Sequence, residues 1–87
     1  MPAPRYTVAL NNLLQAGRIA YERTFVPEGP PHSERWICTV IVTAVANACN
    51  ELTPVSPYLM FTGAGGSKPD AFDVASYSTL IGLGYRT

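Results

Sequence analysis

Hydrophobic positions along this chain follow a helical period near both ends and alternate with polar positions in between. In residues 6–16 the apolar side chains recur at the spacing of one helix face. These side chains are Tyr6, Leu10, Leu13 and Leu14. Gly17 follows, where a helix C-cap belongs. A second period, over residues 68 to about 83, predicts a closing helix whose inward face comprises Ala71, Val74, Ala75 and Ser78.

Between these helices, three segments have the pattern of β-strands. Residues 18–26 include an alternation of Tyr21, Arg23 and Phe25 with side chains of the opposite face. Residues 35–45 are richest in β-branched side chains and alternate clearly. We expect their inward face to comprise Trp36, Cys38, Val40 and Val42. Residues 58–62 predict the third strand.

The segments that join the strands contain residues that interrupt regular structure. Residues 27–34, which are rich in proline, predict a hairpin loop. Residues 46–57 predict a long loop, because they include two prolines and two asparagines. The order of helix, three strands and helix predicts an α+β fold. We expect one domain over residues 1–87, with a core covering about residues 6–83.

The composition narrows the classes of partner. Hydrophobic residues make up 47% of the chain and charged residues 14%, whereas about 25% of residues are charged in typical domains. Six basic and six acidic residues give a net charge of zero. A dedicated nucleic-acid binder usually has a basic excess. The composition by itself therefore favours a protein partner or an oligomer.

Targeting signals and cysteine usage point to the compartment. No apolar run reaches the ~20 residues of a membrane span, and the N-terminus lacks a signal peptide's pattern. Cys38 and Cys49 are too few for a disulfide framework or a zinc site. We expect an intracellular protein, cytoplasmic or nuclear, with no membrane contact, metal or cofactor.

A glycine-rich segment leads into the closing helix. Ser67 can cap this helix, and Asp70 can complete a capping box. Pro69 fits the first turn, where its missing N–H would have no helical partner. Lys68 beside a helix N-terminus is also a feature of anion sites. This segment alone indicates either a well-capped helix or a phosphate site.

Three short motifs occur together at suitable spacing. The first helix carries Leu10-Asn11-Asn12-Leu13, and the hairpin loop carries Gly29-Pro30-Pro31-His32, with Trp36 opening the next strand. Residues 63–71 read Gly-Ala-Gly-Gly-Ser-Lys-Pro-Asp-Ala. Together they resemble the double-stranded RNA-binding domain family. The corresponding family motifs are Leu-Asn-Glu-Leu, Gly-Pro-x-His and Gly-x-Gly-x-Ser-Lys-Lys-x-Ala-Lys.

The resemblance implies two helices on one face of a three-stranded antiparallel sheet. It also implies that the first helix and the hairpin loop enter successive minor grooves of double-stranded RNA, while lysines at the second helix bridge phosphates. Recognition would be of shape, over about 16 base pairs. The RNA-binding residues that it implies are Asn11, Asn12, Gln15, Gly29, Pro30, Pro31, His32, Ser67 and Lys68.

Two departures from the family motif concern the phosphate contacts. Pro69 and Phe72 stand where the motif has its second and third lysines, and Asn12 is shorter than the usual side chain. Because phosphate contacts dominate affinity for nucleic acid, we expect weak, salt-sensitive RNA binding. We also expect that replacing Pro69 and Phe72 by lysine tightens RNA binding and leaves the chain folded.

Two other functions remain open at this point. The first is protein–protein interaction, most simply a homodimer, through apolar side chains expected to be exposed, unless the helix and the long loop cover them. These are Ile37, Ile41, Phe72, Leu80 and Leu83. The second is catalysis, which we do not expect, because the one histidine has no Ser/His/Asp set or carboxylate pair beside it. Asp70, Asp73 and Glu51 are explained as cap, helix surface and loop.

Overall fold

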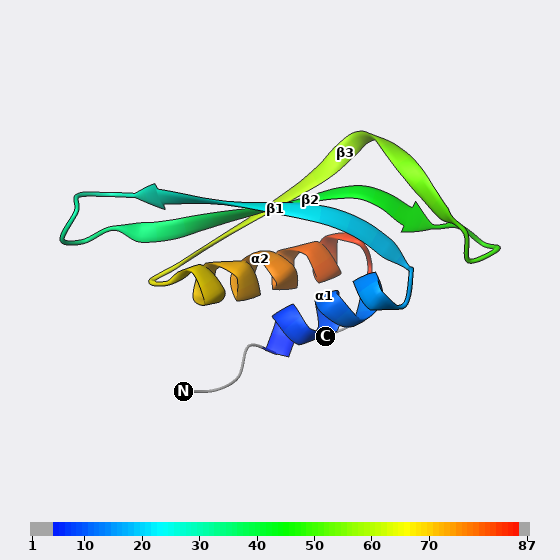
Figure 1. Ribbon diagram of the computed structural model, residues 1–87, viewed down its shortest axis with the longest axis horizontal. Coiled ribbons are helices and arrows are strands. Elements are labelled where there is room, and N and C mark those ends of the chain that lie inside the picture. Colours follow the sequence, from blue (N-terminus) through cyan, green and yellow to red (C-terminus); the bar gives the residue numbers. More distant parts are fainter. Residues whose placement is uncertain (1–4, 86–87) are drawn as a thin grey trace.

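The computed structural model describes residues 5–85, which form one antiparallel sheet and two helices (Figure 1). The elements are α1 (Arg5–Gln15), β1 (Ile19–Glu28), β2 (Arg35–Ala46), β3 (Leu52–Gly65) and α2 (Lys68–Gly82). The strand order is β1-β2-β3. Both helices lie on one side of the sheet, and α2 lies between the sheet and α1 (Figure 1). The predicted α+β fold is confirmed.

Both helices end at a glycine in the left-handed region. Gly17 has φ +74° and ends α1 as predicted. The N–H of Arg18 then donates to the carbonyl of Leu13 at 3.0 Å, a Schellman motif. Gly84, with φ +87°, ends α2 in the same way, and the N–H of Tyr85 donates to the carbonyl oxygen of Leu80 at 2.9 Å. A β-carbon would be strained at either glycine.

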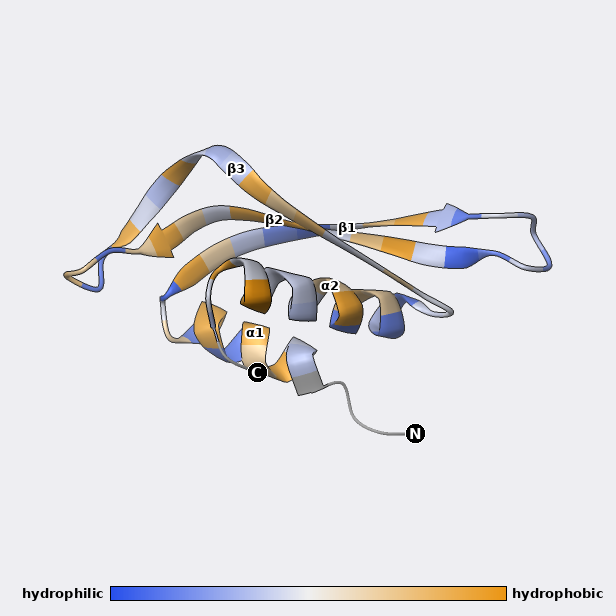
Figure 2. Cartoon of the chain, turned by 180° about the vertical axis from the view of Figure 1, so that it is seen from behind, coloured by the Kyte–Doolittle hydropathy of each residue, from blue (hydrophilic) through white to orange (hydrophobic). Residues whose placement is uncertain are grey.

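The core lies between β2 and α2. The predicted alternation of β2 is confirmed at Cys38, Val40 and Val42, which are fully buried, while Trp36 is partly buried at the margin. Of the other predicted core residues, Leu10, Ala71 and Ala75 are buried and Leu13 is partly buried. Hydrophobic residues run along β2, whereas the end of the β1–β2 hairpin is hydrophilic (Figure 2). Burial of apolar area at this interface holds the fold together.

The buried face of α2 differs from the predicted one. Phe72 and Leu80 are 5% and 3% exposed, so the prediction that they are exposed is wrong. Val74, which was expected to face inward, is 45% exposed. The reason is that α2 has the sheet on one side and α1 on another, so it buries a wider arc than one small-residue stripe. The buried residues are Ala71, Phe72, Ala75, Ser76, Thr79 and Leu80.

The segment predicted to be a long loop mostly belongs to β3. The turn between β2 and β3 covers only residues 47–51, and β3 begins at Leu52. This strand tolerates Pro54 and Pro57 because it lies at the sheet edge and its pairing is interrupted. Residues 55–58 form an arch that leaves β2 and returns to it (Figure 1). The loop prediction failed because it treated the prolines as strand breakers.

Two glycines let β3 pass close to α2. A β-carbon on Gly63 would overlap the backbone of α2 at Ala71 and Ala75. A β-carbon on Gly65 would lie 2.6 Å from the backbone nitrogen of Ala71. Gly66 has open space at the same position. Gly63 and Gly65 are therefore required for packing of the strand on the helix.

Candidate nucleic-acid interface

Ser67 caps the start of α2 as predicted, but within residues 5–85 the Asp70 carboxylate accepts no hydrogen bond, so the capping box is not completed. Ser67 is extended, with φ −143°, and its hydroxyl oxygen accepts the N–H of Asp70 at 3.3 Å. Pro69 occupies the first turn and is exposed. The positive end of the helix dipole therefore points out of the fold beside the exposed Lys68. This end of α2 favours an anion.

The ammonium group of Lys68 lies over aromatic rings of the sheet. Its Nζ is 4.8 Å from the ring centroid of Trp36 and 5.9 Å from that of Phe25. At these distances the rings attract the cation. Lys68 is therefore held near β1 and β2 and does not simply extend into solvent.

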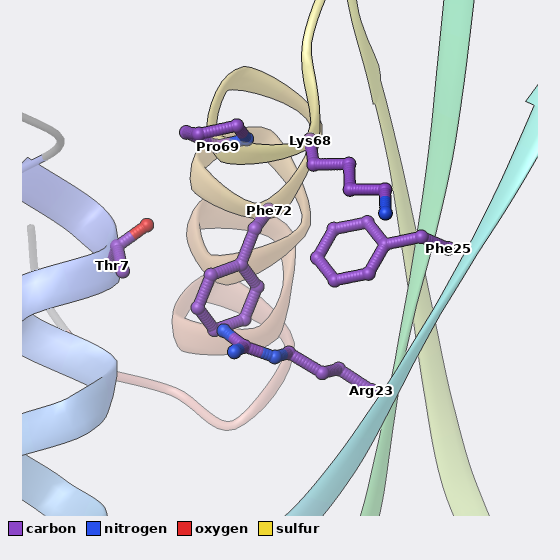
Figure 3. Close-up of a pocket in the computed structure, with 6 residues that line it drawn as sticks. All are labelled: Thr7, Arg23, Phe25, Lys68, Pro69 and Phe72. Atoms are coloured by element: carbon purple, nitrogen blue, oxygen red, sulfur yellow. The ribbon is translucent and has the colours of Figure 1, made fainter.

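A second cation, Arg23 of β1, lies close to the same place. Its Cζ is 4.5 Å from the ring centroid of Phe72 and 5.6 Å from that of Phe25 (Figure 3). Sequence reasoning did not name Arg23 as a site residue. The signal was its place in the alternation beside Tyr21 and Phe25, on the side of β1 that faces the helices.

Arg23 and Lys68 line one cavity of about 350 Å³. Its lining residues are Thr7, Arg23, Phe25, Lys68, Pro69 and Phe72 (Figure 3). No carboxylate is among them. Within residues 5–85 the one ion pair joins Arg35 and Glu28 at 3.1 Å, at the base of the hairpin loop. The cavity therefore carries two positive charges that no ion pair neutralises.

The charge of Arg23 also acts on the adjacent interior. Burial raises the pKa of the Tyr21 hydroxyl, and Arg23 partly offsets this rise. Burial likewise raises the pKa of the Cys38 thiol, again with Arg23 acting in the opposite direction. Both groups stay protonated and neutral at physiological pH, so neither cancels the positive charge of the cavity.

Asn11, Asn12 and Gln15 of α1 are exposed, as the RNA-binding hypothesis requires, whereas Thr7 is partly buried. Thr7, Asn11 and Gln15 recur every four residues and share one face of α1. Thr7 lines the cavity, so Asn11 and Gln15 continue the same face away from it. Asn12 is exposed on the neighbouring face. Thr7 thus adjoins the two cations, and Asn11 and Gln15 lie on the part of this face that leads away from them.

A carboxylate of α2 holds α1 in this position. Asp73 Oδ1 accepts the backbone N–H of Tyr6 at 2.9 Å and that of Thr7 at 3.1 Å. Asp73 therefore caps α1, although the sequence indicated only a helix-surface residue. Its partners are 66 and 67 positions away, and no local motif encodes such a cap.

The tip of the β1–β2 hairpin presents His32 to solvent. Gly29 has φ +99°, and the N–H of Ser33 donates to the carbonyl of Pro30 at 2.9 Å. This hydrogen bond closes a turn that has Pro31 and His32 at its centre, both exposed. Along the long axis of the molecule the hairpin tip comes first, then the start of α2, then α1 (Figure 1). The three predicted RNA-binding segments thus follow one another along the molecule.

The open face of the sheet carries apolar side chains. Ile37 pairs with Val26 and Ala64, and Ile41 pairs with Glu22 and Met60. Val26 is 57% exposed and Met60 65% exposed. Of the predicted interaction surface, only Ile37 and Ile41 lie on this face. Leu83 is partly buried against the core, near Tyr85.

Within residues 5–85, no cluster of three or more histidine, cysteine or acidic side chains could hold a metal ion. None of the helices in that range is long and apolar enough to cross a membrane. Neither a family model nor a curated protein matches the sequence.

Proposed function

We propose that this chain binds double-stranded RNA through the face formed by the hairpin tip, the start of α2 and α1. The observation that carries the proposal is the position of Lys68. It lies at the capped, positive end of α2, between the tip that presents His32 and the helix face of Asn11 and Gln15. A phosphate-binding group between two polar segments suits a duplex whose minor grooves flank a major groove.

In this proposal each segment has its own chemical role. The amides of Asn11, Asn12 and Gln15 contact 2′-hydroxyls and base edges in one minor groove. His32 and the carbonyls of residues 29–31 do the same in the next, and Lys68 binds the phosphates between them. Pro69 carries no charge, and the net charge of the chain is zero. Binding is therefore weak and falls as the salt concentration rises.

A titration tests this proposal directly. The purified chain is titrated with a blunt RNA duplex of about 16–20 base pairs at two salt concentrations, and with a DNA duplex of the same sequence. We expect RNA to bind more tightly than DNA, and Lys68→Gln to weaken RNA binding. Equal affinities for the two duplexes, or no binding of RNA at low salt, would contradict the proposal.

A second candidate function is homodimerisation through the open face of the sheet. The observation that favours it is the run of uncharged side chains across the strands, with Val26 and Met60 largely exposed. Glu22 is the one charged residue in the two pairs of cross-strand partners around Ile37 and Ile41. Glu22 lies on β1, an edge strand, so a second copy can bury the apolar side chains of β2 and β3 while this carboxylate stays at the margin. Phe72 and Leu80 take no part, because they are buried within one chain.

The setting that fits either function is the inside of the cell, cytoplasmic or nuclear. Cys38 and Cys49 are both free thiols. Free thiols are usual in a reducing compartment.

A further inference from the structure

We propose that Arg23 of β1 is the second phosphate-binding cation of this face and replaces, from another element, a lysine that α2 lacks. The inference rests on the RNA-binding function proposed above. It concerns a residue that carries no role in that function so far, and it assigns a binding role to the cavity between α1, β1 and α2.

The first argument is position. Phe72 follows Lys68 by four residues, so the two side chains start from the same face of α2. A lysine at position 72 would place its charge beside Lys68. The chain instead buries the Phe72 ring, and the guanidinium of Arg23 lies 4.5 Å from the ring centroid. The positive charge is thereby present in the same region, although it comes from the sheet.

The second argument is the chemistry of a guanidinium held against rings. A planar guanidinium attracted to an aromatic ring keeps N–H donors available for the paired oxygens of a phosphate. Among the described residues, Arg23 has no ion-pair partner and its side chain donates no hydrogen bond. The rings of Phe25 and Phe72 hold the Arg23 side chain in place, while the N–H groups of its guanidinium donate no hydrogen bond within the described residues. Such an arrangement suits an anionic ligand.

The third argument is the shared cavity. Arg23 and Lys68 approach it from different elements and are separated by the rings of Phe25 and Phe72 (Figure 3). No carboxylate lines the cavity, and that of Asp73, which contacts the lining residue Thr7, already accepts hydrogen bonds from Tyr6 and Thr7. A phosphate in the cavity therefore meets two cations directly. The backbone of an RNA duplex supplies such phosphates along the line from the hairpin tip to α1.

The test measures how RNA affinity depends on salt. Each phosphate contact contributes somewhat under one unit to the slope of log affinity against log salt, taking the duplex-DNA value as a guide. Between 50 and 200 mM salt, one contact therefore accounts for about a threefold fall in affinity. We expect Arg23→Gln to make the slope of log affinity against log salt shallower by the contribution of one phosphate contact. Lys68→Gln should have the same effect. Arg23→Lys keeps the charge and should restore most of the slope.

The matched control is Arg18→Gln, which removes the same charge from an exposed residue in the turn after α1. It should leave the slope unchanged. Circular dichroism verifies that every variant is folded. If part of a sample is unfolded, less protein binds RNA, but the slope still reports the number of phosphate contacts made by the folded protein.

The outcomes separate the two proposals. If Arg23→Gln leaves the slope unchanged while Lys68→Gln lowers it, Arg23 only packs against Phe72, and RNA binding stands without it. An equal effect of Arg18→Gln and Arg23→Gln means that only net charge matters, which also overturns the inference. If the unaltered chain does not bind the RNA duplex, both proposals fail together.

Discussion

The carboxylate of Asp73 in α2 accepts the backbone N–H of Thr7 at 3.1 Å and so joins the two helices end to side. It also accepts the preceding backbone N–H, that of Tyr6. A capping side chain contributes about 0.5–2 kcal/mol when it belongs to the helix that it caps. Here the cap also fixes how one helix docks on the other.

We predict that Asp73→Ala lowers the free energy of unfolding by about 1–2 kcal/mol, because two N–H groups of α1 lose their acceptor. Urea unfolding measures the loss, and hydrogen exchange should be faster in the first turn of α1. Asp70→Ala is the control, since Asp70 is exposed and accepts no such bond. Equal losses for the two variants would show that the cap adds nothing beyond charge.

Gly63→Ala should destabilise the chain strongly, because the added methyl group overlaps the backbone of α2. Overpacking costs about 1–3 kcal/mol, and backbone on both sides leaves no flexible side chain to move away, so we expect the upper end. The control is Gly66→Ala, which places its methyl group in open space. If Gly63→Ala and Gly66→Ala melted at the same temperature, the close approach of β3 to α2 would be refuted.

Lysine substitutions based on the motif that the sequence resembles are expected to be tolerated at position 69 and not at position 72. Pro69 is exposed, so Pro69→Lys should stay folded and tighten RNA binding at low salt. Phe72 is 5% exposed and packs against Phe25, so Phe72→Lys loses that burial and leaves an ammonium group in the core. Removing a buried phenylalanine ring costs about 3–5 kcal/mol. A cooperative melt near the original temperature for Phe72→Lys would contradict the assignment of this ring to the core.

Self-association should depend on the open face of the sheet. At tens of micromolar, light scattering is expected to give a mass above that of one chain, because apolar area is buried between copies. Met60→Glu should restore the monomer, since a carboxylate there loses its water on association. Val8→Glu changes a similarly exposed apolar residue on α1, which lies on the other side of the sheet, and should have no effect. A monomeric mass for the unaltered chain would remove the homodimer hypothesis.

Stability should fall in alkaline solution. Burial raises the pKa of Cys38 above its ordinary value of 9.0 and that of Tyr21 above 10.0, so the folded chain keeps protons that the unfolded chain loses. The stabilisation is fully present when the pH is below the pKa values of the unfolded chain. It is lost as the pH rises through the higher pKa values of the folded chain. Urea unfolding between about pH 8 and pH 11 should show this fall. Cys38→Ala should reduce the fall in the free energy of unfolding at the lower end of this pH range. Cys49→Ala, which removes an exposed thiol, should not.

Local patterns were sufficient for most of the fold. The helix over Arg5–Gln15 and its glycine end follow from period and capping, and β2 follows from its alternation. The cap at Ser67 also follows from neighbouring residues. Each of these features depends on groups within a few positions of one another, so the sequence displays them directly.

Features that depend on two distant elements could not be read in this way. The burial of Phe72 depends on the rings of Tyr21 and Phe25 in β1, and the placement of Arg23 depends on the Phe72 ring of α2. The same limit explains why Asp73 was interpreted as a surface residue. Of the candidate site, the exposed residues of α1 and the hairpin tip could be predicted, whereas the second cation of the cavity could not.

The arch at residues 55–58 has a consequence for how copies of this chain can meet. A long, straight outer strand offers a row of unpaired N–H and C=O groups, and such a row can recruit further strands without limit. In β3 the arch breaks this row, and Pro54 and Pro57 have no N–H to offer. Growth of a fibril along this edge is therefore hindered, and association through the open face of the sheet can close after two copies.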